Sequence, residues 1–151
     1  KPLSIEDSMD LDVDGIKVIG RIDRVDQRKL GFGYMVIDYK TSKKMKTVEE
    51  MEHDFQMVCY HTATKQRYQV GDEQVQVGLM YLKPEIKVNG VYVPQPVYLQ
   101  IANIKDAMIK RAFSSIKQAH EMVTSGQFHY VDKSGKWKCP WCDHYGVCGY
   151  E

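Results

Sequence analysis

Apolar and polar residues alternate over two stretches near the start of the chain, residues 5–13 and 16–25. Such alternation is typical of strands that bury one face, and Asp14-Gly15 between the two stretches is typical of a tight hairpin turn. A polar loop that ends in glycine follows over 27–33, and a third strand is predicted over 34–39. The first part of the chain therefore predicts a β-hairpin and one further strand.

Two long helices are predicted in the rest of the chain. Thr47-x-x-Glu50 has the form of a capping box, and no glycine or proline interrupts residues 48–69, so one helix is expected there. A second helix is expected over 104–125, because its apolar residues recur on one face and Gly126 can end it. We expect these apolar residues to lie in the core: Ile104, Met108, Ala112, Ile116, Ala119 and Val123.

Two further strands are predicted between the helices. Apolar and polar residues alternate over 74–82, which indicates a half-buried strand. The segment 93–101 is expected to pair with it across the turn at Asn89-Gly90. Pro94 and Pro96 lack a backbone donor, so this second strand is expected at the edge of a sheet.

The order of these elements predicts an α/β fold of the mixed α+β type. A chain of 151 residues with 43% hydrophobic and 27% charged residues is ordinary for one globular domain. We expect a single domain over 1–151, with a core over 5–130 and a cysteine-rich tail over 137–151. No apolar stretch approaches the roughly 18 residues of a membrane span, and no signal-peptide pattern is present, so a cytoplasmic protein without a membrane contact is expected.

Two carboxylates and a lysine fall on neighbouring predicted strands. Asp23 lies on the second strand, whereas Asp38 and Lys40 lie two apart on the third and so share one face. Oxygen ligands beside a fixed cation suit a divalent metal and a phosphate group. Isolated charges at strand ends are more often solvated, but Gln56 and Tyr60 add polar groups four apart on one helical face.

The spacing of these residues resembles that of a known family. It is similar to RecB-like nucleases of the PD-(D/E)XK superfamily, which include CRISPR-associated and AddB-type nuclease domains. The resemblance runs from about Ile5 to Glu151. It implies a restriction-endonuclease-like core, in which helices flank a central mixed sheet. The motifs that carry it are Gly20-x-x-Asp23, Asp38-x-Lys40-Thr41 and Gln56-x-x-x-Tyr60.

The resemblance also implies a reaction and roles for these residues. Family members hydrolyse DNA phosphodiester bonds with Mg²⁺ or Mn²⁺, so an exonuclease acting in recombination, repair or phage DNA processing is expected. Asp23, Asp38 and the backbone carbonyl of Tyr39 would bind the metal. Lys40 would hold the attacking water or stabilise the transition state. Gln56 and Tyr60 would contact the substrate backbone or orient Lys40.

Partners follow from the same resemblance. Single-stranded DNA or duplex ends would be the substrate, and a helicase or recombination protein a possible partner. The net charge of +1 gives no general attraction to nucleic acid, so positive charge must be concentrated locally. Four lysines beside the predicted site are candidates for this local positive charge: Lys40, Lys43, Lys44 and Lys46. The alternative is that they lie in a solvated loop without a role in binding. Arg24 is expected to point away from Asp23 and to form an ion pair.

Three cysteines near the end of the chain have the spacing of a metal-binding tail. Cys139, Cys142 and Cys148 form C-x2-C-x5-C, and without secretory features they indicate metal rather than disulfides. Zinc would take His144 as its fourth ligand, and an iron–sulfur cluster would take a fourth cysteine. The resemblance favours a 4Fe–4S cluster in the full protein, with zinc as the alternative. Cys59, within a predicted helix, is expected to be a buried apolar residue.

Two elements of the family pattern are missing at the start of the chain. The family places a cysteine, and then a helix with a Glu or His metal ligand, before the first strand. Only residues 1–4 precede it here, and Glu6 on or beside that strand is not assigned a role. Truncation of a longer parent protein at its N-terminus explains both absences. The fragment alone is then expected to be inactive, because the first motif is missing. The alternative function is a catalytically inactive nucleic-acid-binding module, against which the two carboxylates argue because they repel DNA.

Overall fold

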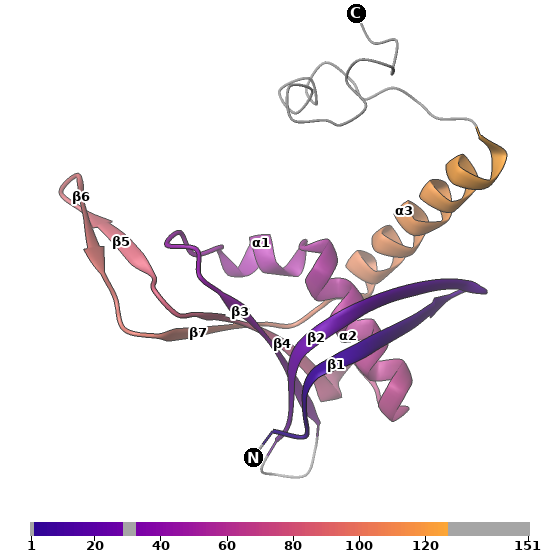
Figure 1. Ribbon diagram of the computed structural model, residues 1–151, viewed down its shortest axis with the longest axis horizontal. Coiled ribbons are helices and arrows are strands. Elements are labelled where there is room, and N and C mark those ends of the chain that lie inside the picture. The colour runs from indigo at the N-terminus through magenta and orange to yellow at the C-terminus, as the bar shows by residue number, and fades with distance from the viewer. Residues whose placement is uncertain (1, 29–32, 127–151) are drawn as a thin grey trace, which may run out of the picture. The chain divides into compact units, whose positions relative to one another are not determined.

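The computed structural model describes residues 2–28 and 33–126 (Figure 1). The chain divides into two units, Lys1–Lys117 and Gln118–Glu151. All the described strands lie in the first unit. Of the second unit, only residues 118–126 at the end of the last helix are described. The strands and the buried residues of the last helix therefore belong to the first unit.

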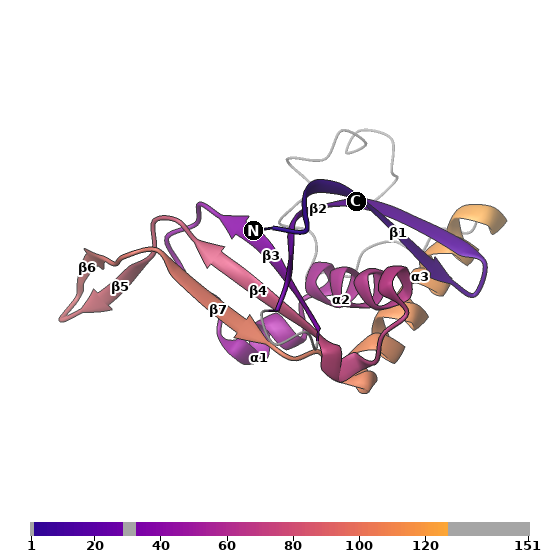
Figure 2. The same cartoon turned by 90° about the horizontal axis from the view of Figure 1, so that it is seen from below.

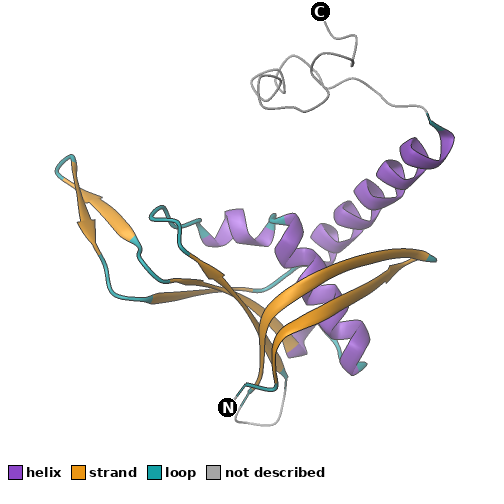
Figure 3. Cartoon of the chain, viewed as in Figure 1, coloured by secondary structure: helices purple, strands orange, loops and turns teal. Residues whose placement is uncertain are grey.

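A five-stranded mixed sheet forms the centre of this unit, with the order β1-β2-β3-β4-β7. β3 and β4 are parallel, and the other neighbouring strands are antiparallel. The helices that accompany the sheet confirm the predicted α+β fold class (Figure 3). The strands are β1 (Ser4–Val13), β2 (Ile16–Gln27), β3 (Tyr34–Lys40), β4 (Val75–Tyr81) and β7 (Tyr98–Ala102).

A separate hairpin corrects the prediction of one strand over 93–101. β5 (Glu85–Val88) and β6 (Val91–Pro94) pair with each other as a second sheet. Asn89 and Gly90 both have positive φ, as a two-residue hairpin turn requires, so this turn closes the small hairpin. β7 begins only after the prolines and pairs with β4, which confirms the predicted edge position. The β5–β6 hairpin extends beyond the main sheet in Figure 1.

The helix predicted over 48–69 is in fact two helices, α1 (Val48–Glu52) and α2 (Phe55–Tyr68). The predicted capping box is present: Thr47 Oγ1 accepts from the Glu50 amide at 3.0 Å, and the Glu50 carboxylate accepts from the Thr47 amide at 2.6 Å. The helix is interrupted at Asp54, whose carboxylate caps α2 by accepting hydrogen bonds from the amides of Gln56 and Met57. Aspartate is among the best N-cap residues, and this preference outweighs the continuous helical pattern.

α2 forms the centre of the hydrophobic core. It packs against β1, β3 and β4, and the β1–β2 hairpin curves over it in Figure 2. Met9, Leu11 and Val13 alternate along β1 and are buried within this core. α3 (Asp106–Ser125) buries Ile109 as well as part of the predicted apolar face. Of that face, Ile104, Ala112 and Ile116 are buried, whereas Ala119 and Val123 are exposed.

The β1–β2 hairpin changes its buried face in the middle. Ile22 and Val25 are both buried although they lie three apart, and regular strand geometry would point them to opposite faces. The pairs Ile5–Arg24 and Asp7–Ile22 set Glu6 opposite Asp23. Glu6 has a φ of 48°, a left-handed conformation that is uncommon for residues with a Cβ. The bend of the hairpin therefore lies at Asp23.

None of the helices in the described part of the chain is long and apolar enough to cross a lipid bilayer.

His61 on α2 is a fully buried titratable group. Its Nε2 lies 3.2 Å from the Asp72 carbonyl oxygen, and its Nδ1 has no hydrogen-bond partner among the described residues. Burial lowers the pKa of His61, although the bond to the Asp72 backbone and the charge of Asp72 oppose this effect. The folded protein therefore holds His61 neutral.

We expect this histidine to make the fold sensitive to mild acid. Unfolded histidine titrates at about pH 6.5, so the unfolded state binds more protons below that pH and the free energy of unfolding falls as pH decreases. The slope from one residue is at most about 1.4 kcal/mol per pH unit. Urea denaturation between about pH 7 and pH 5 measures it. His61→Gln should reduce the slope, and an equal slope in both proteins would contradict this assignment.

Candidate active site

Strand β3 places Asp38 and Lys40 on one face of the sheet, as their spacing predicts. The Asp38 side chain is only 6% exposed, because β3 lies inside the sheet between β2 and β4. Lys40 is the last residue of β3, and its Nζ lies 2.7 Å from Asp38 Oδ2. The end of the strand thus holds a buried carboxylate beside a partly exposed ammonium group.

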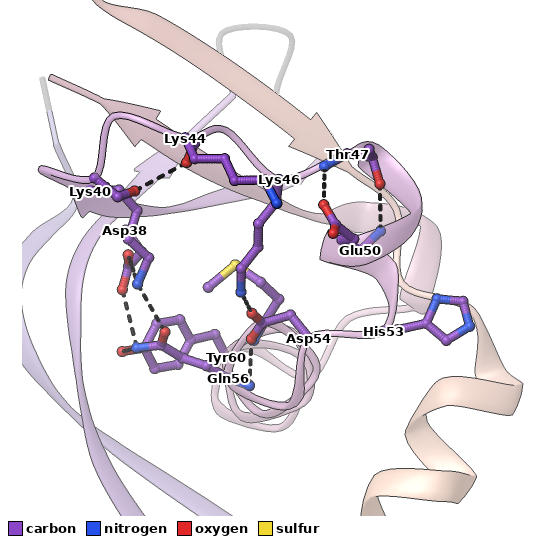
Figure 4. A network of polar contacts seen from close by, with 12 residues as sticks. Asp38, Lys40, Lys44, Lys46, Thr47, Glu50, His53, Asp54, Gln56 and Tyr60 are labelled. Carbon is purple, nitrogen blue, oxygen red and sulfur yellow. Dashed lines mark hydrogen bonds and ion pairs between the residues drawn. The ribbon is translucent and has the colours of Figure 1, made fainter. Parts of the chain in front are cut away.

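Gln56 connects the strand residues to helix α2 (Figure 4). Its Oε1 accepts from Lys40 Nζ at 3.1 Å. Its Nε2 donates to Asp38 Oδ1 at 3.1 Å and to the Tyr60 hydroxyl at 2.7 Å. The Tyr60 hydroxyl donates in turn to the Arg21 carbonyl oxygen on β2 at 2.6 Å. The structure therefore brings four of the predicted site residues into one hydrogen-bonded network.

Asp23 reaches the same region from β2 by a different contact. Its Oδ2 accepts from the Tyr39 amide at 2.8 Å. The last pair of the β2–β3 ladder is Arg24–Ile37, so one further step along that register sets Asp23 opposite Asp38. Asp23 therefore lies near Asp38, and its charge raises the pKa of Asp38, although Asp23 makes no hydrogen bond to the four-residue network among the described residues.

Burial and neighbouring charges control the ionisation of this site. Burial raises the pKa of Asp38, and the charges of Asp23 and Asp54 raise it further, while the contact with Lys40 lowers it. Burial also raises the pKa of Tyr60, and its bond to Gln56 opposes this rise. The charges of Asp23 and Asp54 thus both act on Asp38, and negative charge near a buried carboxylate favours a bound cation.

Asp54 is a site residue that the sequence analysis missed. Burial alone would raise the pKa of Asp54, but the bond from Lys46 and the amides of Met57 and Gln56 together lower it. Asp54 forms an ion pair with Lys46 and caps α2 two residues before Gln56. It therefore fixes the start of the helix that carries Gln56 and Tyr60. An aspartate within a predicted helix was the available sign of this cap.

The few oxygen donors at the site suit a magnesium ion that keeps several of its waters. They are too few for a metal site made of protein ligands alone. Asp38 Oδ2 is buried and paired with Lys40, but it accepts no well-oriented hydrogen bond from the described residues. Asp23, Asp38 and the Tyr39 carbonyl are the oxygen donors in question. The described residues hold no group of three or more His, Cys, Asp or Glu side chains that could bind a metal. Mg²⁺ commonly binds one or two carboxylates and keeps several waters, so this donor set fits it.

Arg24 takes the structural position expected of it. Its Nε and Nη2 each donate to an Asp26 carboxylate oxygen at 2.7 Å, and its Nη1 donates to the Tyr39 hydroxyl at 3.3 Å. The bidentate bond to Asp26 raises the pKa of Arg24 further above its already high value. The ion pair lies within β2, and the bond to the Tyr39 hydroxyl connects β2 to β3 beside the site.

Cys59 lies on the same helix as Gln56 but has no role in the site. It is buried, and burial raises the pKa of its thiol to about 11. A thiol held in this way is a poor metal ligand and nucleophile, which agrees with its predicted part in the core. The predicted metal ligands of the tail lie outside the described residues: Cys139, Cys142, Cys148 and, for zinc, His144.

A comparison with models of known protein families identifies the family of this chain. The family model of the PD-(D/E)XK nuclease superfamily matches residues 1–149. One similar solved structure, titled "Crystal structure of SSO0001", shares 19% identity at a TM-score of 0.49 and is matched over 97% of this chain. This chain spans 59% of the length of that one. No curated protein matches the chain. Superfamily members are typically metal-dependent nucleases, and this chain belongs to the PD-(D/E)XK nuclease superfamily.

Proposed function

We propose that this domain hydrolyses phosphodiester bonds of DNA with a divalent metal bound by Asp23, Asp38 and the Tyr39 carbonyl. One observation carries the proposal. Gln56 bonds to both Asp38 and Lys40, so the carboxylate and the ammonium group have fixed positions beside each other. A domain that only binds DNA has no need of buried carboxylates at its contact surface, because they repel phosphates.

Lys40 is the residue that we assign to the reacting phosphate. A bound Mg²⁺ or Mn²⁺ would supply a water of lowered pKa and would neutralise charge on the phosphate oxygens. Lys40 donates hydrogen bonds from a position 2.7 Å from Asp38, and it can direct one toward the attacking water or the oxygen that gains charge. Its positive charge would then be most useful in the transition state.

Gln56 and Tyr60 are assigned to positioning rather than to chemistry. Gln56 accepts from Lys40 Nζ and so restricts the directions in which the ammonium group can point. Tyr60 holds Gln56 in place through its own bond to the β2 backbone. Because burial raises the pKa of Tyr60, its hydroxyl remains protonated and keeps donating to the Arg21 carbonyl.

The finer assignments follow from the resemblance to RecB-like nucleases. We propose exonuclease activity on single strands or duplex ends in DNA recombination or repair, with a helicase as a partner of the full-length protein. We also propose that Cys139, Cys142 and Cys148 bind a 4Fe–4S cluster in that protein. The iron and zinc contents of the anaerobically purified protein distinguish this cluster from a zinc site.

Cleavage assays on the full-length protein test the proposed function. Linear single-stranded, linear duplex and closed circular single-stranded DNA are incubated with Mg²⁺ or Mn²⁺, and with EDTA as the control. We expect linear DNA to be degraded only when metal is present, and circular DNA to persist. Cleavage of the circle would indicate an endonuclease. Binding of DNA without cleavage in either metal would contradict the proposal and favour the inactive binding module.

A further inference from the structure

A pocket of about 610 Å³ lies between the β5–β6 hairpin and the loop that follows the site strand β3. Neither the metal site nor the network around Gln56 uses it. Its lining combines positive charge with an aromatic ring and one apolar side chain. The lining residues are Lys43, Lys44, Met45, Glu85, Lys87 and Tyr92.

Backbone hydrogen bonds hold this pocket at a fixed place beside the site. The Leu82 amide donates to the Lys40 carbonyl oxygen at 2.9 Å, and the Glu85 amide donates to the Lys43 carbonyl oxygen at 2.9 Å. The base of the hairpin is closed by a bond from the Gln95 amide to the Pro84 carbonyl oxygen at 2.7 Å. The hairpin is therefore anchored to the same segment that carries Lys40.

The distance from the site is short enough for one nucleic-acid strand to reach both. Lys43 follows Lys40 by three residues, which span at most about 11 Å even when fully extended. Successive nucleotides of one strand in a duplex are spaced by about 3.4 Å along the axis. A strand whose phosphate lies at Lys40 would thus pass the pocket within a few nucleotides.

The side chains of the pocket suit both the phosphates and the bases of such a strand. Lys43 forms an ion pair with Glu85 at 2.8 Å, which leaves Lys44 and Lys87 as the positive charges in excess. Lys87 Nζ lies 5.7 Å from the centre of the Tyr92 ring, and Tyr92 is 64% exposed. Ammonium groups bind phosphates, and exposed aromatic rings stack on bases.

We propose that this pocket binds the nucleic-acid strand next to the bond that is cleaved, with Lys44 and Lys87 on phosphates and Tyr92 stacked on a base. The inference rests on the proposed nuclease function and adds a second binding surface to it. A protein partner is the competing occupant, because the hairpin also exposes Ile86, Val88, Val91 and Val93. The excess lysines at the pocket favour a polyanion over an apolar partner surface.

Binding measurements test the pocket in the full-length protein that carries Lys40→Ala, which prevents cleavage. Fluorescence anisotropy with a labelled single-stranded oligonucleotide gives the Kd over a range of salt concentrations. Lys44→Ala with Lys87→Ala should reduce the salt slope of binding by roughly 1.4, about 0.7 for each phosphate contact. Tyr92→Ala should weaken binding about tenfold with little change in that slope. Lys110→Ala is the matched control, an exposed lysine on α3 that is paired only with its neighbour Asp106 in the described structure.

The outcomes separate this inference from the proposed function. If the pocket variants bind as tightly as their parent and, with Lys40 restored, cleave at the unmodified rate, the pocket assignment is wrong and the nuclease assignment stands. An exposed hairpin of that kind would then fit a protein partner. If the unmodified protein neither binds nor cleaves DNA, both assignments fail.

Discussion

Replacing Lys40 with alanine is expected to slow DNA cleavage by about 100- to 1,000-fold, the usual effect of removing one electrostatic donor from a transition state. The Lys40 ammonium group contacts both Asp38 and Gln56, so its position is fixed before substrate binds. We expect DNA affinity to change much less, because other lysines contribute to phosphate binding. Single-turnover cleavage with saturating protein separates the chemical step from binding.

Two controls make this result specific to Lys40. Lys110→Ala removes an equal charge from α3, a helix that contributes no residue to the site, and should cleave at the unmodified rate. Circular dichroism should show that the Lys40→Ala protein is folded, since Lys40 is the terminal residue of its strand. Cleavage at the unmodified rate by folded Lys40→Ala protein would remove Lys40 from the mechanism.

Asp38→Asn is expected to abolish both cleavage and stabilisation of the fold by metal. A ligand that binds only the folded protein adds about 2.7 kcal/mol to the free energy of unfolding at 100 times its Kd. For a protein of this size that gain raises the Tm by roughly 5–10 °C. Asparagine can still accept from Gln56 Nε2, so the network around the site should remain while a charged metal ligand is lost.

Thermal unfolding with and without Mg²⁺ or Mn²⁺ measures this effect without any need for activity. Asp26→Asn is the matched control, because Asp26 is a partly buried aspartate of the neighbouring strand β2 that is paired with Arg24 instead. Its Tm should still rise when metal is added. If Asp38→Asn is stabilised as much as the unmodified protein, Asp38 is not a metal ligand.

Much of the sheet and part of the site can be predicted because they depend on local periodicity. Alternation along a strand has a period of two, so it places Asp38 and Lys40 on one face without knowledge of the fold. The helical spacing of Gln56 and Tyr60 works in the same way, and both residues do meet at the site. These contacts need only the conformation of one element at a time.

The features that were missed depend on competition between local structures or on distant contacts. His53 and Asp54 are neither glycine nor proline, so the helical pattern continues through them. Asp54 is a candidate cap in the sequence, but the pattern alone does not decide between one helix and two. The break becomes stable because Asp54 can cap α2 and pair with Lys46 at the same time. The β5–β6 hairpin was missed because a turn at Asn89-Gly90 can join the strand after it either to the short segment just before it or to the longer strand β4. Only the structure shows that β6 pairs with β5 and that β7 pairs with β4.

The bend at Glu6 and Asp23 divides the β1–β2 hairpin into a base and a tip, which differ in how well they tolerate inserted or deleted residues. The register of the two strands is the same on both sides of the bend and continues unchanged to the turn, so the tip at Asp14-Gly15 can gain or lose residues in matched pairs. Such insertions would leave Asp23 where it is. A single inserted residue between Ser4 and Met9 would instead shift the strand against Asp23 and turn core residues outward. Related nucleases should therefore differ in length at the tip of this hairpin and keep a constant length at its base.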